Sequence, residues 1–193
     1  MDLTQIDFRL AKEDDAKEIL AIYASYINID NITFEYEVPN IIEFRQRIAK
    51  VITKYPYIVA LYQGKIVGYT YASTFRDRIA YNWGLETSIY LTPEVKGQKL
   101  GKKLYTKLEQ ILKIQHITNL VASITYPNPQ SIAFHEKMGY KKIAHFTKCG
   151  YKQGKWYDMI FMEKFINKHE SPAKEIIYIE DIDKTIIDKI LQS

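Results

Sequence analysis

Cysteine is almost missing from this chain of 193 residues, because Cys149 stands alone. A single cysteine can form neither a disulfide framework nor a zinc-binding pattern, so the sequence predicts no disulfide scaffold and no metal site. No apolar run approaches the roughly 18 residues that a membrane-spanning helix needs, and the chain does not open with a basic-then-apolar signal segment. We therefore expect a cytoplasmic protein without a membrane partner.

The excess of one charge is also small. The formal net charge is +4, which helps an anionic ligand to approach but is too low to predict binding to nucleic acid. The remaining composition is ordinary for one globular domain, with 47% hydrophobic and 26% charged residues, apart from a high count of 16 tyrosines. Tyrosine joins apolar area to a polar tip, so some of these side chains are expected to line a pocket.

Hydrophobic periodicity predicts an α+β chain with the order β-α-α-β-β-β-α-β-α-β-β and helices on both faces of a mixed sheet. Apolar residues recur at helical spacing in segments 14–27, 39–52, 100–112 and 130–138. The β-rich runs are 8–11, 57–62, 66–74, 85–91, 118–125, 140–147 and 156–165, while 28–38 and 75–83 are irregular. The composition shifts near Asn167, so we divide the chain into a domain at 1–166 and a C-terminal extension at 167–193. Within the extension, 176–179 favours a strand and 184–191 a helix.

The stretch 86–103 combines a strand, a turn and a basic helix start. Gly97 and Gly101 leave backbone uncovered where the helix begins, and lysines crowd the same few positions, at Lys96, Lys99, Lys102 and Lys103. A helix N-terminus offers unpaired N–H groups and the positive end of a dipole, which suit a phosphate group. The stretch therefore predicts a site for a phosphate-bearing cofactor, with one carboxylate, Glu86, on the strand beside it.

Several motifs point together to one family. They are FEYE at 34–37, RIAYNW at 78–83, ETSIYLTP at 86–93, LGKKLY at 100–105, PNPQSIAFHEKMGY at 127–140 and YKQGKWYD at 151–158. Over roughly residues 6–165 the chain resembles the GNAT N-acetyltransferases, and more closely their phosphinothricin/methionine sulfoximine acetyltransferase branch. The resemblance implies the GNAT fold, an α+β fold whose mixed, mostly antiparallel sheet is flanked by helices. It also implies acetyl-CoA as the co-substrate.

The acyl-CoA signature of that family, Q/R-x-x-G-x-G/A, aligns with residues 96–101. Lys96 replaces the usual Gln or Arg and Lys99 replaces the first glycine, whereas Gly101 is kept. The resemblance assigns the CoA diphosphate to backbone N–H groups of this loop and the pantetheine arm to the preceding strand. The implied cofactor-binding residues are Ile89, Tyr90, Leu91, Lys96, Gly97, Gln98, Lys99, Leu100, Gly101, Lys102, Asn128 and Ser131.

Acetyl transfer from a thioester to an amine needs a neutral amine, donors for the developing oxyanion and a proton for the leaving thiolate. Glu86 is the expected base, acting directly or through water. Asn128, Ser131 and His135 share one stripe of a short helix because they are spaced by three and then four residues. The family places a Tyr or His at the position of His135. We expect His135 to be the general acid or a cofactor contact, and a structural histidine is the alternative.

The acceptor side is indicated by RIAYNW and FEYE, which suggest a narrow aromatic pocket. Arg78 and Tyr81 could bind the carboxylate of an amino acid, and Phe34 and Glu35 could wall the pocket. The resemblance implies a small amino acid or analogue as acceptor, such as phosphinothricin, methionine sulfoximine or methionine sulfoxide, and a homodimer. Two alternatives stay open: another amine, such as a polyamine, an antibiotic or a protein N-terminus, and a non-catalytic acyl-CoA-binding module.

Overall fold

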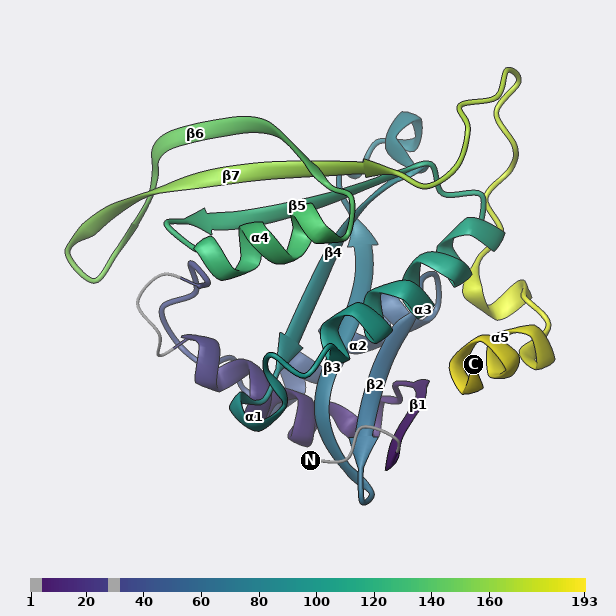
Figure 1. Cartoon of the computed structure of the whole chain (residues 1–193), viewed down its shortest axis with the longest axis horizontal. Coiled ribbons are helices and arrows are strands. Elements are labelled where there is room, and N and C mark those ends of the chain that lie inside the picture. The colour runs from purple at the N-terminus through teal and green to yellow at the C-terminus, as the bar shows by residue number, and fades with distance from the viewer. Residues whose placement is uncertain (1–4, 28–31) are drawn as a thin grey trace.

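Seven strands form one mixed sheet in the part of the chain that the computed structural model describes, residues 5–27 and 32–193 (Figure 1). Their order across the sheet is β1-β2-β3-β4-β5-β7-β6. Only β4 and β5 run parallel, and every other neighbouring pair is antiparallel. The strands are β1 (Ile6–Leu10), β2 (Tyr57–Tyr62), β3 (Lys65–Thr74), β4 (Gly84–Leu91), β5 (Asn119–Tyr126), β6 (Lys141–Lys152) and β7 (Lys155–Phe165).

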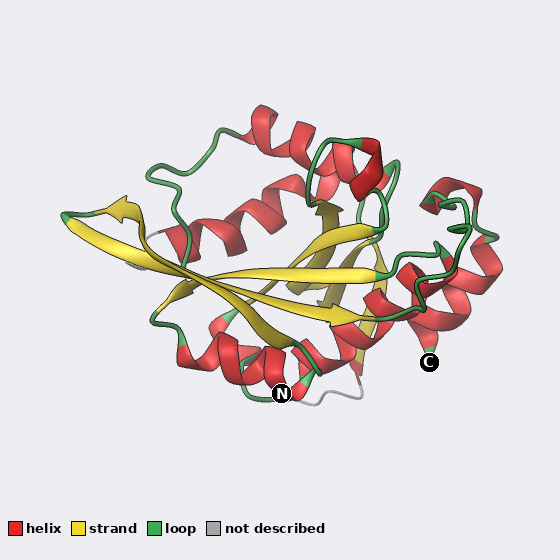
Figure 2. Cartoon of the chain, turned by 90° about the horizontal axis from the view of Figure 1, so that it is seen from above, coloured by secondary structure: helices red, strands yellow, loops and turns green. Residues whose placement is uncertain are grey.

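Helices cover both faces of this sheet (Figure 2). On one face, α1 (Ala16–Ile27) and α2 (Ile41–Ile52) pack against β3. On the other face, α3 (Leu100–Ile114) packs against β2, β3 and β4, and α4 (Pro129–Lys137) packs against β5. Near the C-terminus, α5 (Lys184–Gln192) packs on α3 and β1. The α+β class and the helices on both faces are thus confirmed.

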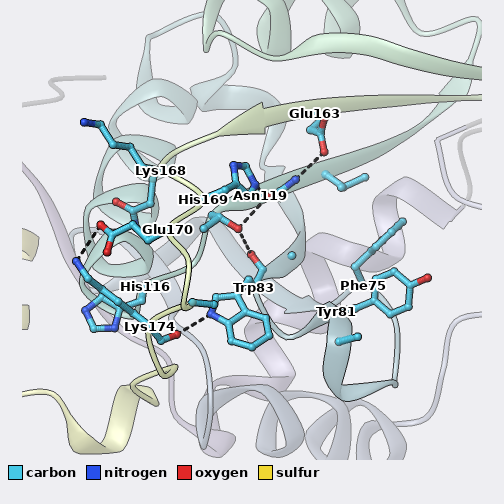
Figure 3. Close-up of a pocket in the computed structure, with 16 residues that line it drawn as sticks. Phe75, Tyr81, Trp83, His116, Asn119, Glu163, Lys168, His169, Glu170 and Lys174 are labelled. Atoms are coloured by element: carbon cyan, nitrogen blue, oxygen red, sulfur yellow. Dashed lines mark hydrogen bonds and ion pairs between the residues drawn. The ribbon is translucent and has the colours of Figure 1, made fainter.

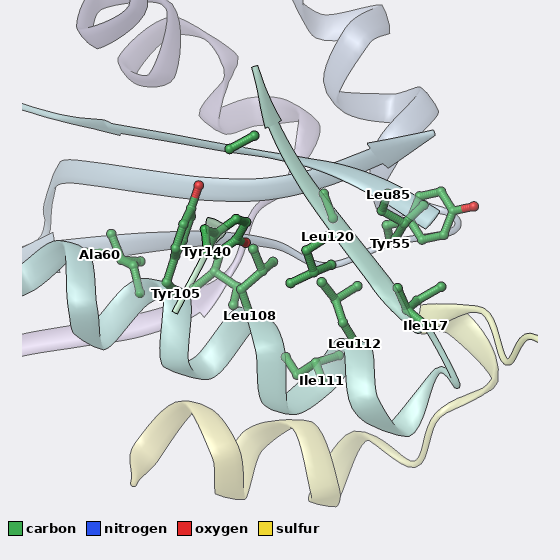
Figure 4. Close-up of a cluster of buried hydrophobic side chains, with 14 of the residues drawn as sticks. Tyr55, Ala60, Leu85, Tyr105, Leu108, Ile111, Leu112, Ile117, Leu120 and Tyr140 are labelled. Carbon is green, nitrogen blue, oxygen red and sulfur yellow. The ribbon is translucent and has the colours of Figure 1, made fainter. Parts of the chain in front are cut away.

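The core on the α3 side follows directly from the helical spacing in the sequence. Five apolar residues at that spacing are completely buried: Leu100, Leu104, Leu108, Ile111 and Leu112. They meet the inward residues Leu85 of β4 and Leu120 of β5 (Figure 4). Burying each such side chain stabilises the fold by about 1.5–3 kcal/mol, so α3 is a firm support for whatever its N-terminus binds.

The C-terminal extension packs into this same core. Ile179, Ile182, Ile187 and Leu191 are buried in the cluster that α3 organises. The ammonium of Lys107, on α3, donates to the carbonyl of Ile190 at 2.9 Å. After the end of β7, therefore, the chain returns to α3, and α5 covers that helix.

Two expectations about local structure need correction. Residues 176–179 do not form a strand. The backbone N–H groups of Ile177 and Ile179 bond to carbonyls of Gln115 and Lys54, outside any strand ladder. A β-branched run favours a strand only where a neighbouring strand is available. The second correction concerns β6, which ends at Lys152 and not at residue 147. A register irregularity between Phe146 and Gly150 interrupts the alternation of side chains, and for this reason the sequence pattern ends too early. Residues 28–31, part of the irregular 28–38 segment, lie outside the described residues.

No helix in the described residues is long and apolar enough to cross a membrane. Within the same residues, no group of three or more His, Cys, Asp or Glu side chains is arranged to hold a metal ion.

Candidate active site

The two parallel strands at the centre of the sheet pair over only a short length. Their register runs from Gly84 opposite Asn119 to Glu86 opposite Val121. Past this point both strands continue, but they diverge (Figure 1). A cavity of about 80 Å³ fills the gap, lined by residues 87–90 of β4, 122–125 of β5, and Tyr105, Asn128, Ser131 and His135 from the two helices beyond. We call this gap the slot.

The loop that follows β4 leads into α3. After the 3₁₀-helix η4 (Pro93–Val95), Gly97 has a φ of 77° and Lys99 a φ of 64°. Both lie in the left-handed region, which costs a residue with a Cβ roughly 1–2 kcal/mol but costs glycine almost nothing. Among the residues that the structure describes, no side chain caps the start of α3 at Lys99. The first N–H groups of the helix are therefore open to an anion.

Contacts of Gly101 with α4 and of Lys96 with α1 hold this loop in place. Gly101 is buried, and a Cβ on it would lie 3.2 Å from the Phe134 ring on α4, so the close contact between α3 and α4 requires a small residue. The Lys96 ammonium lies 4.6 Å from the centre of the Tyr26 ring, a cation–π contact. The Tyr26 hydroxyl in turn donates to the carbonyl of Leu91 at 2.6 Å and accepts from its N–H at 3.1 Å.

His135 is buried at the far side of the slot, with 4% of its surface exposed. Its Nδ1 lies 2.8 Å from the carbonyl oxygen of Ser131, and its Nε2 lies 3.0 Å from the Tyr105 hydroxyl. A carbonyl only accepts, so Nδ1 carries the proton and Nε2 accepts from Tyr105. Burial lowers the pKa of His135 below 6.5, although the Ser131 carbonyl opposes this shift. At neutral pH the imidazole is therefore neutral.

The Tyr105 hydroxyl links this histidine to β4. It lies 3.3 Å from the Thr87 hydroxyl, which is 3.2 Å from the Tyr140 hydroxyl. Desolvation raises the pKa of Tyr105 well above 10, so the phenol keeps its proton. His135, Tyr105 and Thr87 thus form a buried chain of hydrogen bonds along one wall of the slot, in which the single Tyr105 proton is given to Nε2 of His135.

Glu86 projects from β4 on the opposite face from Thr87, because successive side chains of a strand alternate. Its side chain is only partly buried, and no hydrogen bond or ion pair joins it to another described residue. Glu86 pairs with Ser73 across the β3–β4 ladder. Two residues further along, on the same face, Ser88 pairs with Tyr71. Burial raises the pKa of the Tyr71 hydroxyl, and the charges of Glu86, Arg47 and Glu35 all act on it. These charged groups therefore gather around one tyrosine.

A family model described as an acetyltransferase (GNAT) domain matches residues 8–161, most of the chain. The chain belongs to the GNAT acetyltransferase family.

Individual relatives agree with this membership. The phosphinothricin N-acetyltransferase of Alcaligenes faecalis is 32% identical over 169 residues, covering 86% of each chain. An L-methionine sulfoximine/L-methionine sulfone acetyltransferase of Salmonella typhimurium is 29% identical over 124 residues, which are 64% of this chain and 72% of the relative. Among solved structures, a GNAT phosphinothricin acetyltransferase from Sinorhizobium meliloti in complex with AcCoA superimposes with a TM-score of 0.83. It is 31% identical and is matched over 92% of this chain and 97% of its own.

The departure from the GNAT signature at Lys99 now has a structural description. The signature prefers glycine there, and the left-handed φ of Lys99 is the conformation that glycine adopts most easily. Lysine holds the same turn at some cost in strain and adds a charge beside the helix N-terminus. The backbone shape that the signature encodes is therefore present without its first glycine.

The four residues expected on the acceptor side do not meet within one chain. Phe34 packs against Tyr157 at the outer end of β7, with ring centres 6.4 Å apart. Arg78 and Tyr81 lie in the β3–β4 connection, where Tyr81 lines a separate cavity of about 660 Å³ with Trp83 and His169 (Figure 3). Asn119, at the start of β5, lines that cavity. Tyr126, at the other end of β5, pairs with Asp158, the residue next to Tyr157. At roughly 3.3 Å per residue these ends are about 23 Å apart.

Sequence reasoning missed several residues that the fold brings to the site. Tyr105 is buried next to the apolar stripe of α3, where an aromatic residue usually has only a packing role. Its hydroxyl is the one feature that indicates a further role. Tyr71 and Arg47 come from β3 and α2, so no local motif joins them to Glu86. The high tyrosine count was the one available signal. Six tyrosines pack around the Glu86 face of the sheet, namely Tyr23, Tyr26, Tyr57, Tyr69, Tyr71 and Tyr90.

Proposed function

We propose that this chain transfers the acetyl group of acetyl-CoA to the amino group of a small amino acid or amino-acid analogue. The observation that carries the proposal is the slot, which opens between β4 and β5 where their pairing ends at Glu86 and Val121. Along the chain, a free carboxylate at Glu86 comes immediately before the β4 wall of this slot, and an uncapped helix N-terminus with several lysines follows that wall. These are the parts that an anionic thioester donor and an amine acceptor need.

The residues of the slot fit the cofactor. The open N–H groups at the start of α3, with Lys96 and Lys99, would hold the diphosphate. The edge of β4 at Ile89 would pair with the pantetheine arm, while Leu91 is already bonded to Tyr26. The Asn128 side chain accepts from the Ser131 N–H at 3.1 Å and caps α4, so its amide NH₂ is the part left to meet a ligand. When bound, acetyl-CoA supplies the activated acetyl thioester.

Glu86 is the proposed base. An amino group of an amino acid is largely protonated near neutral pH and cannot attack until it loses that proton. The Glu86 carboxylate has no ion-pair partner among the described residues, so it can accept the proton directly or through one water molecule. Its position where β4 and β5 separate places it beside the slot.

His135 is proposed to act through Tyr105. A neutral imidazole whose Nδ1–H is bonded to the Ser131 carbonyl has no proton to donate from Nε2. It accepts from the Tyr105 hydroxyl and so orients that hydroxyl within the slot. Tyr105 has one O–H, which it gives to Nε2 before the reaction, so this O–H would turn toward the sulfur to give a hydrogen bond or a proton to the departing thiolate, and the raised pKa of Tyr105 keeps it protonated until then.

The acceptor is proposed to lie on the Glu86 face. Glu35 accepts from Arg47 at 2.5 Å, and Arg47 also donates to Glu43 at 2.6 Å. This pairing holds Glu35 in place near Tyr71, with Phe34 beside it. The phosphinothricin and methionine sulfoximine acetyltransferases among the relatives act on amino-acid analogues. We therefore propose an acceptor of this kind and assign Phe34 and Glu35 to its wall. Arg78 and Tyr81 are kept as proposed carboxylate contacts, and because they do not meet Phe34 and Glu35 within one chain, this role would require the second protomer of the proposed dimer.

The test is an acceptor screen. Purified protein is incubated with acetyl-CoA and a panel containing phosphinothricin, methionine sulfoximine, methionine sulfone and proteinogenic amino acids, and released CoA thiol is measured. We expect release with at least one analogue and none without an amine. Acetyl-CoA binding by calorimetry without turnover of any amine would favour a non-catalytic acyl-CoA-binding module, and absence of binding would reject the cofactor assignment.

We also propose a homodimer that acts in the cytoplasm, where acetyl-CoA is available. The β6–β7 hairpin supports the dimer because its large apolar side chains are exposed, Phe146 at 54% and Phe165 at 61%. Exposed aromatic residues grouped on one face are typical of an interface. Light scattering should give twice the monomer mass, and Phe165→Lys should shift it toward the monomer. Cell fractionation tests the location.

A further inference from the structure

Lys152, in the YKQGKWYD motif, is almost completely buried, with 1% of its surface exposed. Its ammonium donates to the carbonyl oxygens of Ile27 and Thr33, each at 2.8 Å. Ile27 is the last residue of α1, so the positive charge lies at the negative end of a helix dipole. A lysine is rarely buried unless its charge is satisfied by such contacts. Lys152 therefore joins the end of the β6–β7 hairpin to both sides of the α1–α2 connection.

The preceding residues of β6 hold the same connection. The Phe34 ring covers Gly150 so closely that a Cβ on Gly150 would overlap the ring. The next residue, Tyr151, accepts at its carbonyl a hydrogen bond from the Tyr36 hydroxyl. Three successive residues of β6 thus fix residues 32–36, although more than a hundred residues separate them in the chain.

Residues 32–36 also reach both parts of the proposed site. Ile32 lines the slot. Glu35 forms an ion pair with Arg47 of α2. The negative charges of Glu35 and Glu86 both raise the pKa of the Tyr71 hydroxyl. A shift of this segment would therefore move the Phe34 and Glu35 side chains against the acceptor without changing the loop at the start of α3.

We infer that Lys152 is a positioning residue for the acceptor: by holding the carbonyls of Ile27 and Thr33 it fixes the wall formed by Phe34 and Glu35. It touches neither substrate itself. This role rests on the proposed function, in which those two side chains face the acceptor. It predicts that loss of the ammonium weakens acceptor binding while acetyl-CoA binding is kept.

Three variants test this role by steady-state kinetics with the best acceptor from the screen. Lys152→Met keeps the length of the side chain and removes the charge, and it should raise the acceptor KM about tenfold. The KM for acetyl-CoA should change less than about twofold. Lys152→Arg restores the donors and should recover part of the loss. The matched control is Lys155→Met, since Lys155 is the exposed cross-strand partner of Lys152 and should leave both KM values unchanged. Equal changes in both KM values of Lys152→Met would overturn the positioning role.

Gly150→Ala provides a variant that leaves Lys152 intact. Gly150 does not have a positive φ, so alanine fits the backbone, and the three atoms nearest to its Cβ all belong to the Phe34 ring. The ring must move, and we expect the ratio of kcat/KM values between short and long acceptors to change at least threefold. An unchanged ratio would remove Phe34 and Gly150 from the acceptor wall.

Hydrogen–deuterium exchange separates this inference from the proposed function. Peptides containing residues 32–36 should exchange faster in Lys152→Met than in the parent chain or in Lys155→Met, whatever the activity. If no amine is acetylated by the parent chain but the exchange still differs, the proposed function fails while the anchoring by Lys152 stands. If exchange in 32–36 is the same in all three proteins, the inference fails even where an amine is acetylated.

Discussion

The proposed donor side and the proposed acceptor side of this GNAT chain are built in different ways. The donor side is nearly continuous in sequence, since β4, the loop at Gly97 and Lys99, and the start of α3 follow one another within 86–101. The acceptor side is assembled from β3, α2, the 32–36 segment and the end of the β6–β7 hairpin. In the proposed site, therefore, local geometry would determine where the cofactor is held, whereas tertiary contacts would determine which amine can approach it.

The largest expected effect comes from Glu86, which stands between the two sides. Glu86→Gln removes the proposed base without changing the size of the side chain, so kcat/KM should fall about 100-fold. The loss should be greatest at neutral and lower pH, where the acceptor amine is most protonated. A pH–rate profile measured for both proteins checks this. A profile with the same shape in the variant would remove Glu86 from the mechanism.

Tyr105→Phe has the next largest expected effect and tests the proposed donor side. It deletes the hydroxyl that His135 orients, and kcat should fall about tenfold while the acceptor KM stays within about twofold. Tyr140→Phe is the matched control, because Tyr140 lies in the same hydrogen-bond chain but does not line the slot. If the two variants lose the same activity, Tyr105 acts only in packing.

Lys99→Gly tests the strain in the cofactor loop. Relief of the left-handed conformation, less the extra flexibility of glycine in the unfolded chain, should raise the free energy of unfolding by about 0.5 kcal/mol. Lys102→Gly, inside α3, should lower it by about 1 kcal/mol. Urea denaturation measures both changes. Destabilisation by Lys99→Gly would mean that the lysine side chain contributes more than the strain costs.

The smallest effect concerns pH. Burial lowers the pKa of His135 in the folded state, so the unfolded chain binds more protons as the pH falls below about 6.5. The contribution of neutral His135 to stability is complete above that pH and is lost as the pH falls toward the lower, folded-state value. In His135→Phe the free energy of unfolding should depend less steeply on pH just below about 6.5, where the unfolded histidine takes up its proton and the folded one does not. An identical slope would contradict a buried neutral histidine.

The comparison of the two sides also explains how far the sequence could be interpreted. The apolar stripe of α3, the strand at Glu86 and the glycines of the cofactor loop are local patterns, so the sequence alone predicts each of them. Lys152 and Arg47 could not be found in this way. A lysine and an arginine in polar segments look like solvated residues, and their partners lie 119 and 12 residues away. The strand expected at 176–179 failed for a related reason, because the partners of its N–H groups are on distant loops.

The short pairing of β4 with β5 has a kinetic consequence. Glu86 and Thr87 face opposite sides of the sheet, so the proposed acceptor position and the hydrogen-bond chain of Tyr105 and His135 lie on different faces, joined through the slot. Each substrate can therefore enter or leave while the other is in place. Initial-velocity lines for the two substrates should intersect, and CoA should not be released in the absence of an amine.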